Sequence, residues 1–82
     1  MYYTYILKSE KGKLYIGSSS NLTRRLKEHK AGKSWTTKRM ANVELIFYEA
    51  FKDKRDALRR EKYFKTTKGR FSFKQILRES LK

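Results

Sequence analysis

The sequence predicts an α+β fold in which a small three-stranded antiparallel sheet is flanked by helices. Three observations lead to this class. Two alternating apolar segments joined by a glycine-containing turn predict an N-terminal β-hairpin, a third strand-like segment follows at 42–51, and the apolar residues elsewhere recur at helical spacing. The predicted order is strand, strand, helix, strand, helix, helix, which places helices against an antiparallel sheet.

The predicted hairpin has strands over residues 2–7 and 13–19. Aromatic and aliphatic side chains alternate with others in both segments. Gly12 suits the turn between them, and Gly17 suits a close approach of the backbone.

A short helix is predicted over residues 22–30. Asn21 is the best-placed N-cap after a run of three serines, and Gly32 is a C-terminal stop. His29 shares a helix face with two leucines, and Arg25 lies four residues earlier on the flank of that face. These two polar side chains are expected to point toward one site.

Residues 32–41 are polar and basic apart from Trp35 and are predicted to form a loop. Trp35 is interpreted as a cover over the small core, with base stacking as the alternative. The third strand follows over 42–51 and returns to apolar alternation.

Asp53 is predicted to cap a helix that continues to about Phe64. Its apolar stripe contains Ala57, Leu58 and Phe64, and Glu61 falls inside this stripe. A carboxylate in an apolar stripe is costly unless it is paired or bound to a metal. The ordinary alternative for Glu61 is a salt bridge to Arg25 or to a nearby lysine.

Residues 66–69 break the helical pattern, and a last helix is expected to pack on the sheet. The apolar residues assigned to that contact are Phe71, Phe73, Ile76 and Leu77.

Size and charge limit what the chain can do. Its 82 residues are expected to form one domain over 1–82 with a small core. The absence of cysteine and the single histidine exclude a thiolate or histidine-cluster metal site. No apolar stretch is long enough for a signal peptide or membrane span, so a cytoplasmic location without membrane contact is expected.

The net charge is +14, from 22 Lys and Arg against 8 Asp and Glu. Such a chain repels itself unless it binds a polyanion, so nucleic acid is the expected partner, with an affinity that falls as salt rises. The sequence identifies no protein partner.

The hairpin motifs resemble those of the GIY-YIG endonuclease family, in particular its short stand-alone bacterial members, over nearly the whole chain. Tyr-Ile-Gly at 15–17 reproduces the second half of the family signature. Tyr-Thr-Tyr at 3–5 corresponds to the first half, where the glycine is missing and the tyrosine is kept. The resemblance implies that Tyr5 and Tyr15 are catalytic, whereas strand tyrosines are otherwise ordinary core aromatics.

Three further positions fit the same family. Arg25 follows the motif tyrosine by ten residues in an Asn-Leu-x-x-Arg-Leu context, and His29 lies where family members carry His or Tyr. Glu61, in an Ala-Leu-x-x-Glu context, corresponds to the metal-binding carboxylate. Ser18 is a departure, because some repair-type members have lysine there. Without the resemblance, Arg25 would be interpreted as a solvated helix residue, and His29 as either a surface residue or a proton shuttle.

The resemblance therefore implies a divalent-metal-dependent DNA endonuclease that hydrolyses phosphodiester bonds, of use in DNA repair or recombination. Glu61 would hold Mg²⁺ or Mn²⁺, either tyrosine, with His29, would activate the attacking water, and Arg25 would stabilise the transition state. The residues assigned to substrate binding are Ser18, Arg24, Arg59, Arg60, Lys62 and Lys65. The alternatives are a non-catalytic nucleic-acid-binding module with the same fold and a basic RNA-binding accessory of the ribosome.

Overall fold

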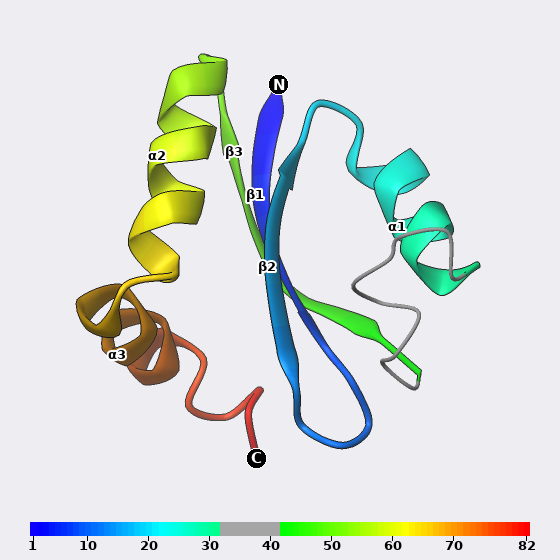
Figure 1. Cartoon of the computed structure of the whole chain (residues 1–82), viewed down its shortest axis with the longest axis vertical. Coiled ribbons are helices and arrows are strands. Elements are labelled where there is room, and N and C mark those ends of the chain that lie inside the picture. Colours follow the sequence, from blue (N-terminus) through cyan, green and yellow to red (C-terminus); the bar gives the residue numbers. More distant parts are fainter. Residues whose placement is uncertain (32–41) are drawn as a thin grey trace.

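The computed structural model describes residues 1–31 and 42–82. The predicted α+β class and order of elements are confirmed (Figure 1). The predictions for the loop at 32–41, for Gly32 and for Trp35 lie outside the described residues. The elements are β1 (Tyr2–Lys8), β2 (Leu14–Ser19), α1 (Leu22–Lys30), β3 (Glu44–Phe51), α2 (Lys54–Phe64) and α3 (Thr67–Ile76).

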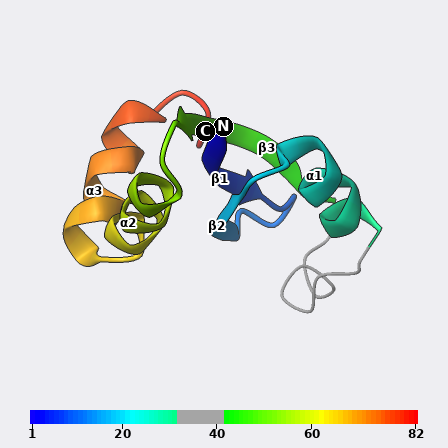
Figure 2. The same ribbon diagram turned by 90° about the horizontal axis from the view of Figure 1, so that it is seen from above.

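The three strands form one antiparallel sheet in the order β2-β1-β3, so β2 is an edge strand. Helices α2 and α3 lie on one side of the sheet and α1 on the other (Figure 2). The layers are therefore helix pair, sheet, helix. None of the helices in the described ranges is long and apolar enough to cross a membrane.

The central strand β1 supplies side chains to both sides of the sheet. Thr4 is buried and its hydroxyl donates a 2.7 Å hydrogen bond to the Ala57 carbonyl in α2. The next residue, Tyr5, is also buried but contacts His29 in α1. Successive side chains of a strand point to opposite faces. One strand thus anchors α2 and builds a polar cluster under α1.

The apolar core lies between the sheet and the helix pair. Its buried members are Ile6, Ile16, Phe64, Phe73 and Leu77. The prediction of core positions was wrong for Leu58, Phe71 and Ile76, whose exposures are 43%, 68% and 56%. These side chains are exposed because each helix buries only one narrow stripe of its surface.

The corner between α2 and α3 is shorter than the break predicted at 66–69. Thr66 caps α3, because its side chain accepts a hydrogen bond from the Gly69 amide, and the helix already begins at Thr67. A side chain at Gly69 would collide with the Tyr63 carbonyl of α2. Glycine therefore allows the two helices to meet closely.

Candidate active site

A polar cluster forms where β1 faces α1, around the Tyr5 hydroxyl. Tyr5 has no exposed surface, and its hydroxyl lies 2.9 Å from the His29 Nε2. The Arg25 Nε donates to the same hydroxyl at 3.4 Å. Tyr5 and His29, which are 24 positions apart in the chain, are thus in contact because α1 lies on this side of the sheet.

The direction of one of these contacts is fixed by chemistry, because a guanidinium can only donate and the Tyr5 oxygen therefore accepts from Arg25. The direction of the hydrogen bond between the Tyr5 hydroxyl and the His29 Nε2 depends on the tautomer of His29. Burial raises the pKa of Tyr5 to about 12, despite the hydrogen bond from Arg25. Burial, with the nearby Arg25 charge, lowers the pKa of His29. At neutral pH the pair is therefore a neutral phenol and a neutral imidazole.

At Tyr5 the loss of hydration on burial outweighs the attraction of the guanidinium. Tyr5 therefore keeps its proton at neutral pH.

Tyr15 lies beside this cluster on β2. Its ring centroid is 4.9 Å from that of His29 and 6.2 Å from that of Tyr5, and its side chain is only partly buried. The pKa of Arg25 is raised mainly by its hydrogen bond to Tyr5, with smaller contributions from Glu28 and Tyr15.

Gly17 makes room for the Tyr5 hydroxyl. The two residues are cross-strand partners in β1 and β2. A Cβ atom on Gly17 would lie 2.6 Å from the Tyr5 hydroxyl oxygen and 3.0 Å from the Tyr15 Cε1. A close approach does occur at Gly17, but its partners are tyrosine side chains, whereas the prediction was a close approach of the backbone. By contrast, Gly12 has a φ of +85° and serves the turn.

Glu61 reaches the neighbouring residue of β2 from the other side of the sheet. One carboxylate oxygen accepts a 2.7 Å hydrogen bond from the Ser18 hydroxyl, and the other pairs with the Lys65 ammonium at 2.9 Å. The Glu61 side chain is 21% exposed. Its charge also helps to raise the pKa of Tyr5, although burial contributes most. Glu61 and the tyrosine cluster therefore lie near each other across the edge strand.

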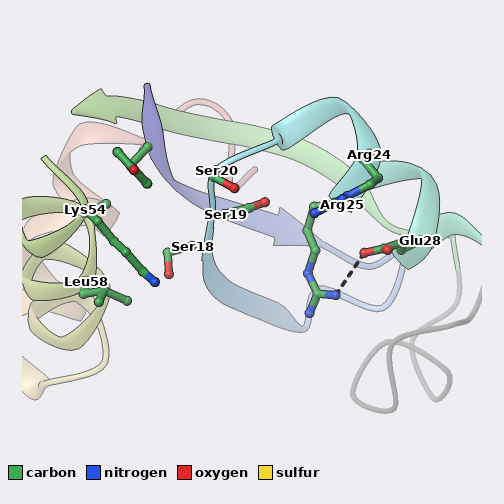
Figure 3. Close-up of a pocket in the computed structure, with 10 residues that line it drawn as sticks. Ser18, Ser19, Ser20, Arg24, Arg25, Glu28, Lys54 and Leu58 are labelled. Carbon is green, nitrogen blue, oxygen red and sulfur yellow. Dashed lines mark hydrogen bonds and ion pairs between the residues drawn. The ribbon is translucent and has the colours of Figure 1, made fainter. Parts of the chain in front are cut away.

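A cavity of about 540 Å³ opens beside the end of β2, between α1 and α2 (Figure 3). Within residues 1–31 and 42–82 no further strand covers this edge of the sheet, so groups from both faces meet there. Lys54 was not predicted from the sequence as a cavity residue. Its spacing could have indicated this, because it lies four residues before Leu58 and seven before Glu61 and so shares one side of α2 with them. The labelled side chains are Ser18, Ser19, Ser20, Arg24, Arg25, Glu28, Lys54 and Leu58.

The other basic residues assigned to substrate binding lie outside this cavity lining. Arg59 pairs with Asp56 at 3.0 Å on the surface of α2. Arg60 pairs with Glu49 of β3 at 2.8 Å, and its guanidinium carbon lies 4.4 Å from the Phe64 ring centroid. Lys62 is exposed. Arg60 thus joins α2 to the sheet.

The oxygen donors suit a hard divalent cation that keeps most of its own water. Glu61 supplies a carboxylate, with the Ser18 hydroxyl next to it. Within the described ranges, no three or more His, Cys, Asp or Glu side chains gather as a metal site. Mg²⁺ is commonly held by one or two carboxylates plus water and phosphate oxygens, so this set fits Mg²⁺ or Mn²⁺.

The sequence is similar to a known protein family and to several known proteins. The family model described as the GIY-YIG catalytic domain matches residues 1–75. A UPF0213 protein of Clostridium perfringens is 36% identical over 100% of this chain and 89% of its own length. One of Staphylococcus haemolyticus is 37% identical over 92% of this chain and 93% of its own.

A solved structure shares the fold. The solution NMR structure of a UPF0213 protein from Bacillus halodurans superposes with a TM-score of 0.58 at 29% sequence identity. The match covers 93% of this chain and 85% of that protein.

Proposed function

Because the chain belongs to the GIY-YIG catalytic-domain family, a nuclease-type family, we propose that it is a divalent-metal-dependent endonuclease that hydrolyses phosphodiester bonds in DNA. One observation carries the proposal. The Tyr5–His29–Arg25 cluster and the Ser18–Glu61 pair approach the same edge strand, beside an open basic cavity.

The cavity suits the phosphodiester backbone. Arg24, Arg25 and Lys54 supply positive charge, and the serines at 18–20 supply hydroxyl donors. Arg25 pairs with Glu28 through side chains that are about one-third exposed, so a phosphate can replace this partner. A guanidinium can then hold a phosphate through two parallel hydrogen bonds.

Each member of the cluster has a distinct part in the proposed reaction. Tyr5 holds His29 and Arg25 in place, because its proton is retained at neutral pH. Tyr15, the less buried tyrosine, orients the attacking water. Arg25 stabilises the negative charge that develops on the phosphate. Tyr5 therefore positions the other groups.

Glu61 and Ser18 would hold the divalent cation. A bound Mg²⁺ or Mn²⁺ supplies Lewis-acid charge that stabilises the leaving oxygen. Lys65 occupies one Glu61 oxygen through a half-exposed ion pair, which is weak enough to be replaced.

A non-catalytic nucleic-acid-binding module with the same fold is the second candidate. The observation that favours it is that both Glu61 oxygens already have partners, Ser18 and Lys65. In that case Glu61 would be a structural carboxylate and its removal would weaken the fold.

A cleavage assay with Glu61→Gln separates the two candidates. Plasmid nicking is measured over a titration of Mg²⁺ and Mn²⁺, with a chelator control, and DNA binding and unfolding are measured in parallel. We expect the substitution to abolish cleavage and to leave binding intact. Glu79→Gln is the matched control, because it removes the same charge from an exposed pair with Lys82. Equal cleavage by the parent and Glu61→Gln would refute Glu61 as the metal ligand. No metal-dependent cleavage of duplex, branched or single-stranded DNA by the parent would refute the nuclease.

A further inference from the structure

We propose that α2 and α3 carry a second nucleic-acid surface, the stacking surface, which binds an unpaired DNA strand through Phe71 and Tyr63. It lies outside the candidate active site. It concerns binding, so it stands whether or not the chain cleaves DNA.

The two aromatic rings of this surface are exposed to different extents, and the core does not use Phe71. Phe71 is 68% exposed and Tyr63 is 38% exposed, whereas α3 packs through Phe73 and Leu77. A groove of about 740 Å³ runs along Phe71 and includes Tyr63, Lys68 and Ile76. Exposed apolar groups gathered in one groove on a small protein mark a binding site more often than chance placement does.

The charges around the groove favour a polyanion. Residues 59–78 contain eight Lys and Arg and one carboxylate, Glu61. Lys68 and Lys74 lie three residues before and after Phe71, so both flank its ring on the helix. Neither lysine pairs with a carboxylate in the part of the chain that the structure describes. Phosphates of a bound strand can therefore pair with both lysines.

Exposed rings between cations select an unpaired strand over a duplex. In a duplex the base faces are covered by their neighbours, so a protruding ring gains nothing by stacking. In a single strand every base offers a face to an aromatic side chain, while the phosphates meet the cations. An acidic protein partner would pair with the lysines, but it would not explain why exposed aromatic rings lie between them.

The stacking surface and the cavity lie on different flanks of α2. Tyr63 follows Lys54 by nine residues, which turns it about 180° around the helix at about 100° per residue. Lys54 lines the cavity and Tyr63 lines the groove. A DNA strand that leaves the cavity and passes around α2 can therefore bind the groove as a second contact.

Binding of a labelled oligo(dT) strand tests the proposal, with fluorescence anisotropy as the readout. Phe71→Ala is expected to weaken binding about tenfold or more, the usual loss for a stacking residue, and Phe71→Trp is expected to retain it. Ile76→Ala is the matched control, because Ile76 is an exposed apolar neighbour at 56% without a ring. The affinity of Ile76→Ala is expected to fall far less than that of Phe71→Ala, because its side chain has no ring to stack on a base.

Duplex DNA of the same charge and oligo(U) RNA complete the experiment, and thermal unfolding checks each variant. Duplex binding is expected to change little in Phe71→Ala. Equal losses for Phe71→Ala and Ile76→Ala would overturn stacking in favour of apolar docking. Equal losses for strand and duplex, unchanged oligo(dT) binding, or much tighter binding of RNA than DNA would also overturn the proposal. Absence of cleavage would refute only the nuclease assignment.

Discussion

Replacing Gly17 with alanine would test whether the Tyr5 hydroxyl must lie where the fold holds it. The new methyl carbon would be 2.6 Å from the hydroxyl oxygen and 2.7 Å from the ring carbon that carries it. Non-bonded heavy atoms at optimal separation lie about 3.5 Å apart, so the hydroxyl must move by about 1 Å. Tyr5 has no exposed surface, so this movement disturbs its 2.9 Å contact with His29.

Two effects of different size follow from this displacement. Overpacking at a buried site costs about 1–3 kcal/mol of unfolding free energy. A 1 Å misplacement of catalytic groups costs about 10²-fold in rate. The rate is measured under single-turnover conditions at saturating enzyme, below the unfolding transition, and urea unfolding gives the stability of each variant.

Gly12→Ala provides the matched control. Gly12 has a φ of +85° but nothing within 4 Å of an added Cβ. Alanine there costs about 1–2 kcal/mol through backbone strain, similar to the loss at Gly17, but leaves the tyrosine cluster undisturbed. If Gly17→Ala cleaves as fast as Gly12→Ala per folded molecule, the placement of the Tyr5 hydroxyl has no part in the reaction.

Three further predictions concern charge and protonation. Arg25→Ala is expected to lower the single-turnover rate by about 10²-fold or more, because Arg25 belongs to the Tyr5 cluster. Arg24→Ala is expected mainly to weaken DNA binding. Equal losses of rate in the two variants would contradict the assignment of Arg25 to the active site. Folding lowers the pKa of His29, so the unfolding free energy of the protein should fall as the pH drops below about 6.5. Urea unfolding at pH 7.5 and at pH 5 measures this fall, which should be smaller in His29→Gln than in the parent. An equal fall in both proteins would exclude His29 as the cause. Affinity for duplex DNA should drop by orders of magnitude between low and moderate salt, similarly for unrelated sequences, because Lys and Arg neutralise phosphates; a flat salt dependence would contradict this.

Local features of the fold were predictable from the sequence because their causes lie within a few residues. Asn21 caps α1 by accepting a hydrogen bond from the Arg24 amide, and Asp53 caps α2 through the Arg55 amide. Gly12 forms the turn through its positive φ. Such contacts span two or three residues, so the sequence alone determines them.

Burial on the helices was less predictable. Ala57 and Phe64 are buried as expected, whereas Leu58 and Phe71 are exposed. Helical periodicity shows which residues share a side of a helix, but the width of the buried stripe depends on the surface that the helix meets. In α3 that surface is the narrow contact at Gly69 and Phe73.

The strands, the helices and the spacing of Tyr5, Tyr15, Arg25 and Glu61 along the chain follow from local sequence patterns. That Glu61 accepts a hydrogen bond from Ser18, 43 residues away, on the side of the sheet opposite the tyrosines, follows only from the folded chain. Periodicity orients a side chain within its own element but does not say which element it will meet. The face of the sheet that each helix covers, and the open edge at β2 where the two faces meet, come from packing between distant segments.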